Sequence, residues 1–166
     1  MQRSYYLKNE IKIGTAGEHL TICDILLQGY KCFKVEDQLP FDIVMFDTKN
    51  KMYKIQVKST LNRKRNYHTK NKISYCFSVI RQKRVRTKIK EKEGYTYHHQ
   101  ENKYTKDDYD ILALVVIPLK KVFYYRFKDI KLKYISLKGD EKQHLNRCLD
   151  NPITDEKIIK KIKRCY

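Results

Sequence analysis

Residues 55–60, IQVKST, place an amide and an ammonium group two positions apart within a segment of strand-forming residues. On a strand, Gln56 and Lys58 point to one face, while Ile55 and Val57 point to the other. A second polar residue, Asp42, interrupts the apolar run LPFDIVMF earlier in the chain. We therefore treat Asp42, Gln56 and Lys58 as one candidate site.

The chain between these residues predicts how they meet. The segment DTKNK, residues 47–51, is typical of a hairpin turn, and a turn centred near residues 49–50 places Asp42 opposite residues 56–58. Glu18 precedes them on a predicted helix and shares a stripe with Ile22 and Ile25. Two carboxylates and an amide oxygen are hard ligands that suit Mg²⁺, and the lysine can orient a water or hold a phosphate.

At this point the residues resemble the PD-(D/E)XK nuclease superfamily. The tripeptide Pro40-Phe41-Asp42 stands where that family has its Pro-Asp pair, with one residue inserted, and QVK at 56–58 stands where it has (D/E)XK. GEH at 17–19 corresponds to the glutamate on the first helix. The resemblance covers residues 14–60 well. It implies an α/β fold with a restriction-endonuclease-like core, a mixed β-sheet flanked by helices.

The later part of the chain is similar in a looser way, because residues 104–125 look like the later strands of intron-encoded and Holliday-junction-resolving members. One departure matters more. The family usually has Asp or Glu where this chain has Gln56, which lowers the charge of the site by one. Some group I intron homing endonucleases of the superfamily carry Gln there and remain active, so that branch is the nearest resemblance.

The resemblance also implies roles for the residues. The expected catalytic residues are Glu18, Asp42, Gln56 and Lys58. The expected metal ligands are Asp42, Glu18, Gln56 and Val57, with Mg²⁺ as the cofactor and Mn²⁺ as its substitute. Asp107, Asp108 and Asp110 are expected to start a later strand, with a smaller chance that one of them supports the site.

The elements that must position the site follow from periodicity. Residues 15–28 predict a helix that Gly29 ends, with Leu20, Cys23 and Leu27 on one apolar stripe. The predicted strands are 30–36, 41–46, 53–59, 73–80, 110–117 and 121–127, and residues 155–164 predict a terminal helix. The alternating strand 73–80 points Ile73, Tyr75, Phe77 and Val79 to one side. We expect one nuclease domain over residues 1–166.

Charge points to the partner. The chain has 37 Lys and Arg against 19 Asp and Glu, a formal net charge of +18, and such a surface attracts polyanions. Part of the lysine excess can also reflect an AT-rich genome. The basic stretches 62–72 and 81–103 are either phosphate-contacting arms or solvated loops. The residues expected to bind double-stranded DNA are Arg63, Lys64, Arg65, Lys70, Arg81, Lys83, Arg84 and Arg86. His68, His98 and His99 are expected to contact phosphates or solvent rather than a metal.

The remaining features bound the class of protein. Five cysteines without a Cys-x-x-Cys pair argue against a zinc site or a disulfide framework, and Cys23 and Cys76 are expected in the core. No apolar run long enough for a membrane span and no signal peptide is found, so we expect a cytoplasmic or nucleoid-associated protein that is not secreted.

The expected activity is that of a metal-dependent, homing-endonuclease-like DNA endonuclease, working as a dimer or tetramer that associates through Ile22 and Ile25. Two alternatives remain. One is a Holliday junction resolvase or restriction-type nuclease with the same site, and the other is a catalytically decayed nucleic-acid-binding protein.

Overall fold

The structure is a computed structural model that describes residues 2–36, 38–66, 72–88 and 95–153. Within the described part of the chain, no helix is long and apolar enough to cross a membrane. The predicted helix at 155–164 and the predicted DNA contact Lys70 lie outside the described residues.

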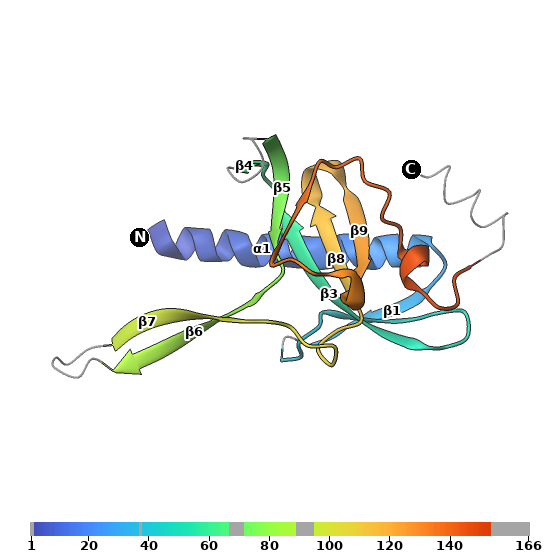
Figure 1. The fold of residues 1–166 in the computed structure, drawn as a ribbon, viewed down its shortest axis with the longest axis horizontal. Coiled ribbons are helices and arrows are strands. Elements are labelled where there is room, and N and C mark those ends of the chain that lie inside the picture. Colours follow the sequence, from blue (N-terminus) through green and yellow to red (C-terminus); the bar gives the residue numbers. More distant parts are fainter. Residues whose placement is uncertain (1, 37, 67–71, 89–94, 154–166) are drawn as a thin grey trace.

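A five-stranded mixed sheet forms the centre of the fold (Figure 1). Its order is β1-β2-β3-β8-β9, and the strands are β1 Lys31–Lys34, β2 Ile43–Phe46, β3 Met52–Thr60, β8 Ile111–Val116 and β9 Lys121–Arg126. Only the β3–β8 pair is parallel among these neighbours. All six residues of β8 are buried, as a strand covered on both faces requires. These five strands confirm the predicted ones to within two residues at each end.

One face of this sheet is covered by the helix α1, Gln2–Leu27, which Figure 1 shows running across the back of the strands. The helix starts thirteen residues before the predicted start at residue 15. Gly29 follows it with φ of +84°, a left-handed conformation that ends a helix at low cost, as predicted.

The face of α1 that packs on the sheet differs in part from the predicted stripe. Cys23 is exposed and Leu27 is 55% exposed, so the predicted Leu20–Cys23–Leu27 stripe is wrong for two of its three members. The buried ridge is formed by Gly17, Thr21 and Ile25. Small residues take this position because the helix comes very close to β3, where a Cβ on Gly17 would lie 2.5 Å from the Cβ of Ser59.

The same ridge corrects the predicted self-association surface. Ile25 is fully buried and Ile22 packs against the core of this chain. Ile25 is therefore not available to a second copy, and Ile22 is only partly exposed.

The second face of the central sheet is covered by strands rather than by a helix. The strands β4 Lys64–Asn66, β5 Lys72–Ser78 and β10 Tyr134–Leu137 form a three-stranded antiparallel sheet in the order β10-β5-β4. Tyr75 and Phe77 of β5 are buried against Leu112 and Leu114 of β8, as the alternation of this strand predicted. The mixed α/β class is thus confirmed, with the helix on one face of the sheet.

Two further strands, β6 Arg81–Lys88 and β7 Tyr95–Asn102, pair with each other over their whole length. Figure 1 shows this two-stranded ribbon extending away from the rest of the fold. The basic segment after residue 81 is therefore a strand rather than a loop. Short 3₁₀ helices occur at Ile117–Leu119 (η1), Phe127–Asp129 (η2) and Leu145–Cys148 (η3).

Candidate active site

The register of the β2–β3 hairpin places Asp42 directly opposite Gln56. Ile43 pairs with Ile55, and the backbone N–H of Asp42 donates to the carbonyl of Ile55 at 2.9 Å. The turn that sets this register contains Asn50 at φ of 59°, a left-handed conformation that Asn tolerates better than most residues. The sequence predicted only that the residue opposite Asp42 lies between 56 and 58. The structure shows that it is residue 56.

The Asp42 carboxylate is held by two hydrogen bonds from β3. Its Oδ2 accepts from Nε2 of Gln56 at 2.5 Å and from the backbone N–H of Val57 at 2.7 Å. Gln56 is 8% exposed, and its Nε2 also donates to the carbonyl of Val57 at 3.1 Å. Three of the predicted site residues are therefore in direct contact, and the amide group acts as a donor toward the carboxylate.

Lys58 lies beside a hollow between the two sheets. It is partly buried, and its Nζ lies 5.6 Å from the ring centroid of Tyr104, within the range of a cation–π contact. The hollow has a volume of about 340 Å³ and is lined by Lys58, Ser59, Cys76, Phe77, Ser78 and Ile80. Ser78 Oγ is buried there and has no hydrogen-bond partner among the described residues. An ammonium group and an unsatisfied hydroxyl therefore line one open space.

Glu18 reaches the same corner of the sheet from α1, but it has a partner of its own. Its Oε2 lies 2.8 Å from Nζ of Lys34, and the Glu18 side chain is 17% exposed. Lys34 pairs with Ile43, the residue after Asp42, and the N–H of Val35 donates to the carbonyl of Asp42 at 2.9 Å. The carboxylate of Glu18 is thus brought near the start of β2, where it forms an ion pair with a lysine of β1.

Sequence reasoning missed both Lys34 and Tyr104. The only sequence signal for Lys34 was that Cys32 and Lys34 alternate onto one face of β1. In the structure, the Cys32 thiol on this face points to the carbonyl of Ile22 on α1 at 3.9 Å. No comparable signal existed for Tyr104, which reaches Lys58 from the segment between β7 and β8.

The predicted site contains hard oxygen donors. Asp42 and Glu18 supply carboxylates, Val57 a backbone carbonyl and Gln56 an amide, and oxygen ligands of these types are those that Mg²⁺ takes. Gln56 presents its nitrogen to Asp42, so rotation of the amide by half a turn is needed to offer Oε1. Among the described residues, no group of three His, Cys, Asp or Glu side chains could hold a metal ion. A cation here therefore depends on Gln56 and the backbone.

The three aspartates before β8 have structural partners. Asp110 Oδ2 accepts from the N–H of Lys54 at 2.8 Å, and Asp108 Oδ2 accepts from the N–H of Thr105 at 2.6 Å. Asp107 is exposed in the same turn. Asp110 directly precedes β8, whereas Asp107 and Asp108 lie in the turn before it.

The predicted DNA contacts fall in two places. Arg63 and Lys64 are exposed at the start of β4, and Arg63 lies 5.1 Å from the ring centroid of Tyr75. Arg81 is exposed at the start of the ribbon. The remaining described members belong to strands, Arg65 to β4 and Lys83, Arg84 and Arg86 to β6. His98 and His99 are part of β7, and His68 lies outside the described residues.

A comparison with solved structures agrees with this fold, whereas the sequence comparisons find no match. The sequence matches no family model and no curated protein. The chain is similar to a solved structure described as that of a bacterial homing endonuclease, I-Ssp6803I, with a TM-score of 0.51 and 18% sequence identity. The match covers 92% of this chain and 94% of the other. The two proteins therefore share a nuclease-like fold over nearly their whole lengths.

Proposed function

We propose that this protein is a metal-dependent DNA endonuclease of the PD-(D/E)XK type, nearest to the homing endonucleases that carry Gln in the motif. The observation that carries the proposal is the contact of Asp42 Oδ2 with both Gln56 and Val57, with Lys58 one position further along β3. The order of these residues in the chain matches the motif, and the shared fold supports the same conclusion.

The residues would divide the work as follows. Asp42, Glu18, Gln56 and Val57 would hold Mg²⁺ or Mn²⁺, which supplies charge to polarise the scissile phosphate and to lower the pKa of a water. Lys58 would donate a hydrogen bond to a phosphate oxygen as negative charge develops on it, or orient the attacking water. Lys34 would hold the Glu18 carboxylate in place until the cation competes for it.

DNA binding would come from surfaces outside this cluster. A two-stranded β-ribbon is narrow enough to enter the major groove of B-DNA, and β6–β7 is such a ribbon with Arg and Lys along β6. Arg63 and Lys64 would add phosphate contacts at the neighbouring sheet. Two copies of one active site can cut both strands in a single binding event, so we also propose that the protein acts as a dimer or tetramer.

The direct test compares Asp42→Ala and Lys58→Ala with the parent protein on plasmid DNA with Mg²⁺. We expect each change to reduce cleavage by at least 10³-fold, because each removes a group at the reacting phosphate. DNA binding in a shift assay should persist. Lys142→Ala, which removes an exposed lysine far along the chain, is the matched control and should cleave normally. Full activity of Asp42→Ala would contradict the proposal.

A second candidate function rests on Gln56 and Lys34. An amide in place of a carboxylate, together with a Glu18 that is already ion-paired, weakens the cation site and favours a DNA-binding protein without activity. The parent protein decides between them: it should bind DNA in either case, but only a nuclease converts plasmid to linear or nicked DNA. Comparing a four-way junction with a linear duplex then separates a junction resolvase from a homing enzyme.

A further inference from the structure

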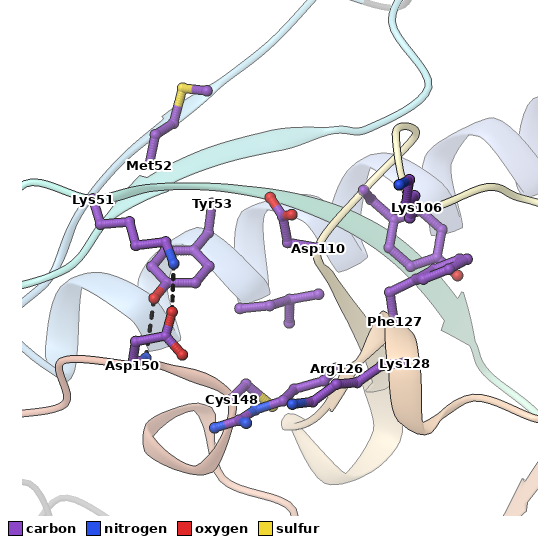
Figure 2. A pocket seen from close by; sticks show the side chains of 12 residues that line it. Lys51, Met52, Tyr53, Lys106, Asp110, Arg126, Phe127, Lys128, Cys148 and Asp150 are labelled. Atoms are coloured by element: carbon purple, nitrogen blue, oxygen red, sulfur yellow. Dashed lines mark hydrogen bonds and ion pairs between the residues drawn. The ribbon is translucent and has the colours of Figure 1, made fainter.

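A second hollow lies at the end of the central sheet where β8 has not yet begun. The strand β3 starts at Met52, but β8 starts at Ile111 opposite Ile55, and β9 ends at Arg126 opposite the same Ile111. This leaves a gap between the start of β3 and the end of β9. A pocket of about 250 Å³ occupies it, and Figure 2 shows the side chains that line it.

Basic side chains from three separate segments surround this pocket. They are Lys51 from the β2–β3 turn, Lys106 from the segment before β8, and Arg126 and Lys128 from the end of β9. The pocket also has two acidic residues, Asp110 and Asp150.

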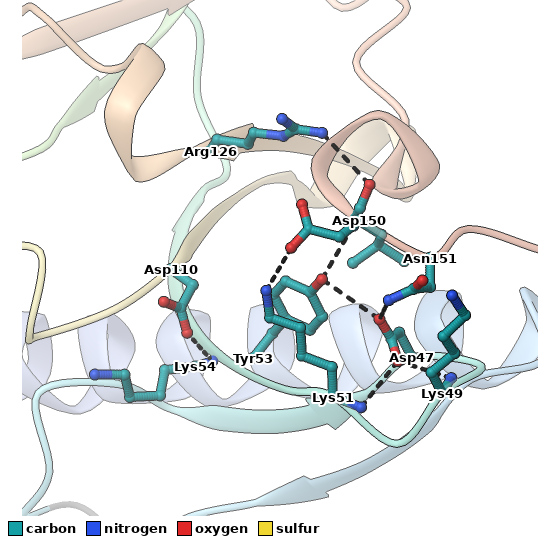
Figure 3. A network of polar contacts seen from close by, with 10 residues as sticks. Asp47, Lys49, Lys51, Tyr53, Lys54, Asp110, Arg126, Asp150 and Asn151 are labelled. Atoms are coloured by element: carbon teal, nitrogen blue, oxygen red, sulfur yellow. Dashed lines mark hydrogen bonds and ion pairs between the residues drawn. The ribbon is translucent and has the colours of Figure 1, made fainter.

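The two acidic residues are outnumbered by the four basic ones, so the pocket keeps a net positive charge. Asp150 forms an ion pair with Lys51, and Asp110 Oδ2 accepts from the backbone of Lys54 (Figures 2 and 3). Within the part of the chain that the structure describes, Lys106 and Lys128 have no ion-pair partner. Burial raises the pKa of the Cys148 thiol in this pocket to about 11, so the thiol adds no negative charge near neutral pH.

Arg126 is the residue that points to a ligand. Its Nε is buried and has no hydrogen-bond partner among the described residues. Its Nη2 donates only a long hydrogen bond, 3.4 Å, to the carbonyl of Leu149. A buried donor without an acceptor is costly, and a guanidinium group matches the oxygens of a phosphate with two parallel hydrogen bonds.

We infer that this pocket binds a phosphate group, with Arg126 as the central ligand and Lys106 and Lys128 as flanking charges. The phosphate has two possible sources. It can be a free phosphate ion, or it can be a phosphodiester of bound DNA, and the second source rests on the proposed function. Lys58 lies five positions after Tyr53 of this pocket on β3, which corresponds to roughly 17 Å at about 3.3 Å per residue. That distance equals about five base pairs along a duplex.

The first experiment uses inorganic phosphate as the probe and contains no divalent cation. The Tm of the parent protein is followed against phosphate at constant ionic strength, beside Arg126→Gln, the double variant Lys106→Gln, Lys128→Gln, and the control Lys142→Gln. We expect phosphate to raise the Tm of the parent and the control. It should have little effect on the Tm of the other two. The double variant changes only exposed side chains, so it remains informative if Arg126→Gln does not fold.

The second experiment measures duplex DNA binding against salt with the same four proteins, again without a divalent cation, so that a failure of the cleavage proposal does not affect it. If the source is DNA, Arg126→Gln should lower the slope of log affinity against log salt by about one and weaken binding about tenfold. Free phosphate should then compete. An unchanged slope together with the Tm effect assigns the pocket to a free phosphate ion. The inference is overturned if phosphate leaves the Tm of the parent unchanged and Arg126→Gln also leaves the slope unchanged.

Discussion

Gln56 holds the Asp42 carboxylate through its amide nitrogen, and this single contact defines the chemistry of the site at the scale of residues. A glutamate in the family pattern would repel Asp42 unless a cation lay between them. The amide replaces that repulsion by a hydrogen bond, so the hairpin closes onto Asp42 without help from a cation. We expect the site to bind the cation more weakly with Gln56 than with a glutamate, because a neutral oxygen attracts the cation less than a carboxylate does.

The change Gln56→Glu tests whether Gln56 stabilises the hairpin at the expense of cation affinity. It should tighten Mg²⁺ binding at least tenfold by adding a negative charge, and lower the free energy of unfolding without Mg²⁺ by about 1–3 kcal/mol by removing the donor to Asp42. Cleavage need not become faster, since a more neutralised cation is a weaker Lewis acid. Calorimetric titration with Mg²⁺ and denaturant unfolding measure both effects. Gln143→Glu, the same chemical change elsewhere, should alter neither, and unchanged Mg²⁺ affinity in Gln56→Glu would remove Gln56 from the site.

At the scale of elements, the closeness of α1 to β3 places Glu18 beside the site. Gly17 lies directly over Ser59, whose Oγ donates to the carbonyl of Ile13 at 2.9 Å. The next residue of the helix, Glu18, then reaches Lys34 on β1. The position of Glu18 therefore depends on the absence of a side chain at residue 17.

Two glycines of the same helix allow a matched test. In Gly17→Ala, the new methyl group would lie 2.5 Å from Ser59 Cβ, so α1 must shift, and we expect a loss of about 1–3 kcal/mol in the free energy of unfolding. Cleavage should fall as well, because Glu18 moves with the helix. In Gly14→Ala nothing lies within 4 Å of the added Cβ, and a gain of up to about 1 kcal/mol is expected from helix propensity. Denaturant unfolding of both variants checks the pair, and equal stabilities would contradict the close approach.

How far the sequence predicts this architecture depends on the element. Short apolar or alternating runs found all five central strands, and turn-forming residues found the turn at 47–51. The sequence did not reveal the buried ridge of α1, because Gly17 and Thr21 are not apolar markers and the close approach that selects them is tertiary. The sequence placed Asp42 with Gln56 because both lie on one hairpin. It missed the Lys34–Glu18 ion pair because that contact joins a helix and a strand and depends on tertiary packing.

The β2–β3 turn is held by the chain that follows η3. The carboxylate of Asp47 accepts from the backbones of Lys49 and Lys51, both at 2.9 Å, and from Nδ2 of Asn151 at 2.8 Å (Figure 3). Burial works against the charge of Asp47, but the hydrogen bonds from Asn151, Lys51 and Lys49 outweigh it and hold the pKa of its carboxyl below the usual value. This turn sets the register that brings Asp42 opposite Gln56.

The lowered pKa gives a pH prediction with a definite sign. Because the pKa of Asp47 is lower in the folded state than the ordinary 3.8, its stabilisation is complete above that value and is lost as pH falls through the folded pKa. Asp47→Asn should be less stable by about 1–3 kcal/mol at neutral pH, and the difference from the parent should shrink in acid. Denaturant unfolding between pH 2 and 7 measures it. A constant difference over that range would show that the charge of Asp47 does not contribute.

At the scale of the whole molecule, charge and shape both favour a polyanion as the partner. A formal net charge of +18 on 166 residues makes copies of the protein repel one another and attracts polyanions. The exposed Arg63 and Lys64 and the basic strand β6 place part of this charge on elements that extend beyond the central sheet (Figure 1).

Salt dependence separates the two origins of the charge. If the protein neutralises about six to ten phosphates, its affinity for duplex DNA should fall by roughly 10³ to 10⁵ between 50 and 200 mM salt. The paired change Arg84→Gln, Arg86→Gln on β6 should lower the slope by about two, whereas Lys142→Gln should leave it unchanged. Binding isotherms at four or more salt concentrations give the slopes. An affinity that barely changes with salt would assign the lysine excess to the genome, and equal slopes for the ribbon variant and the parent would remove β6 from the DNA interface.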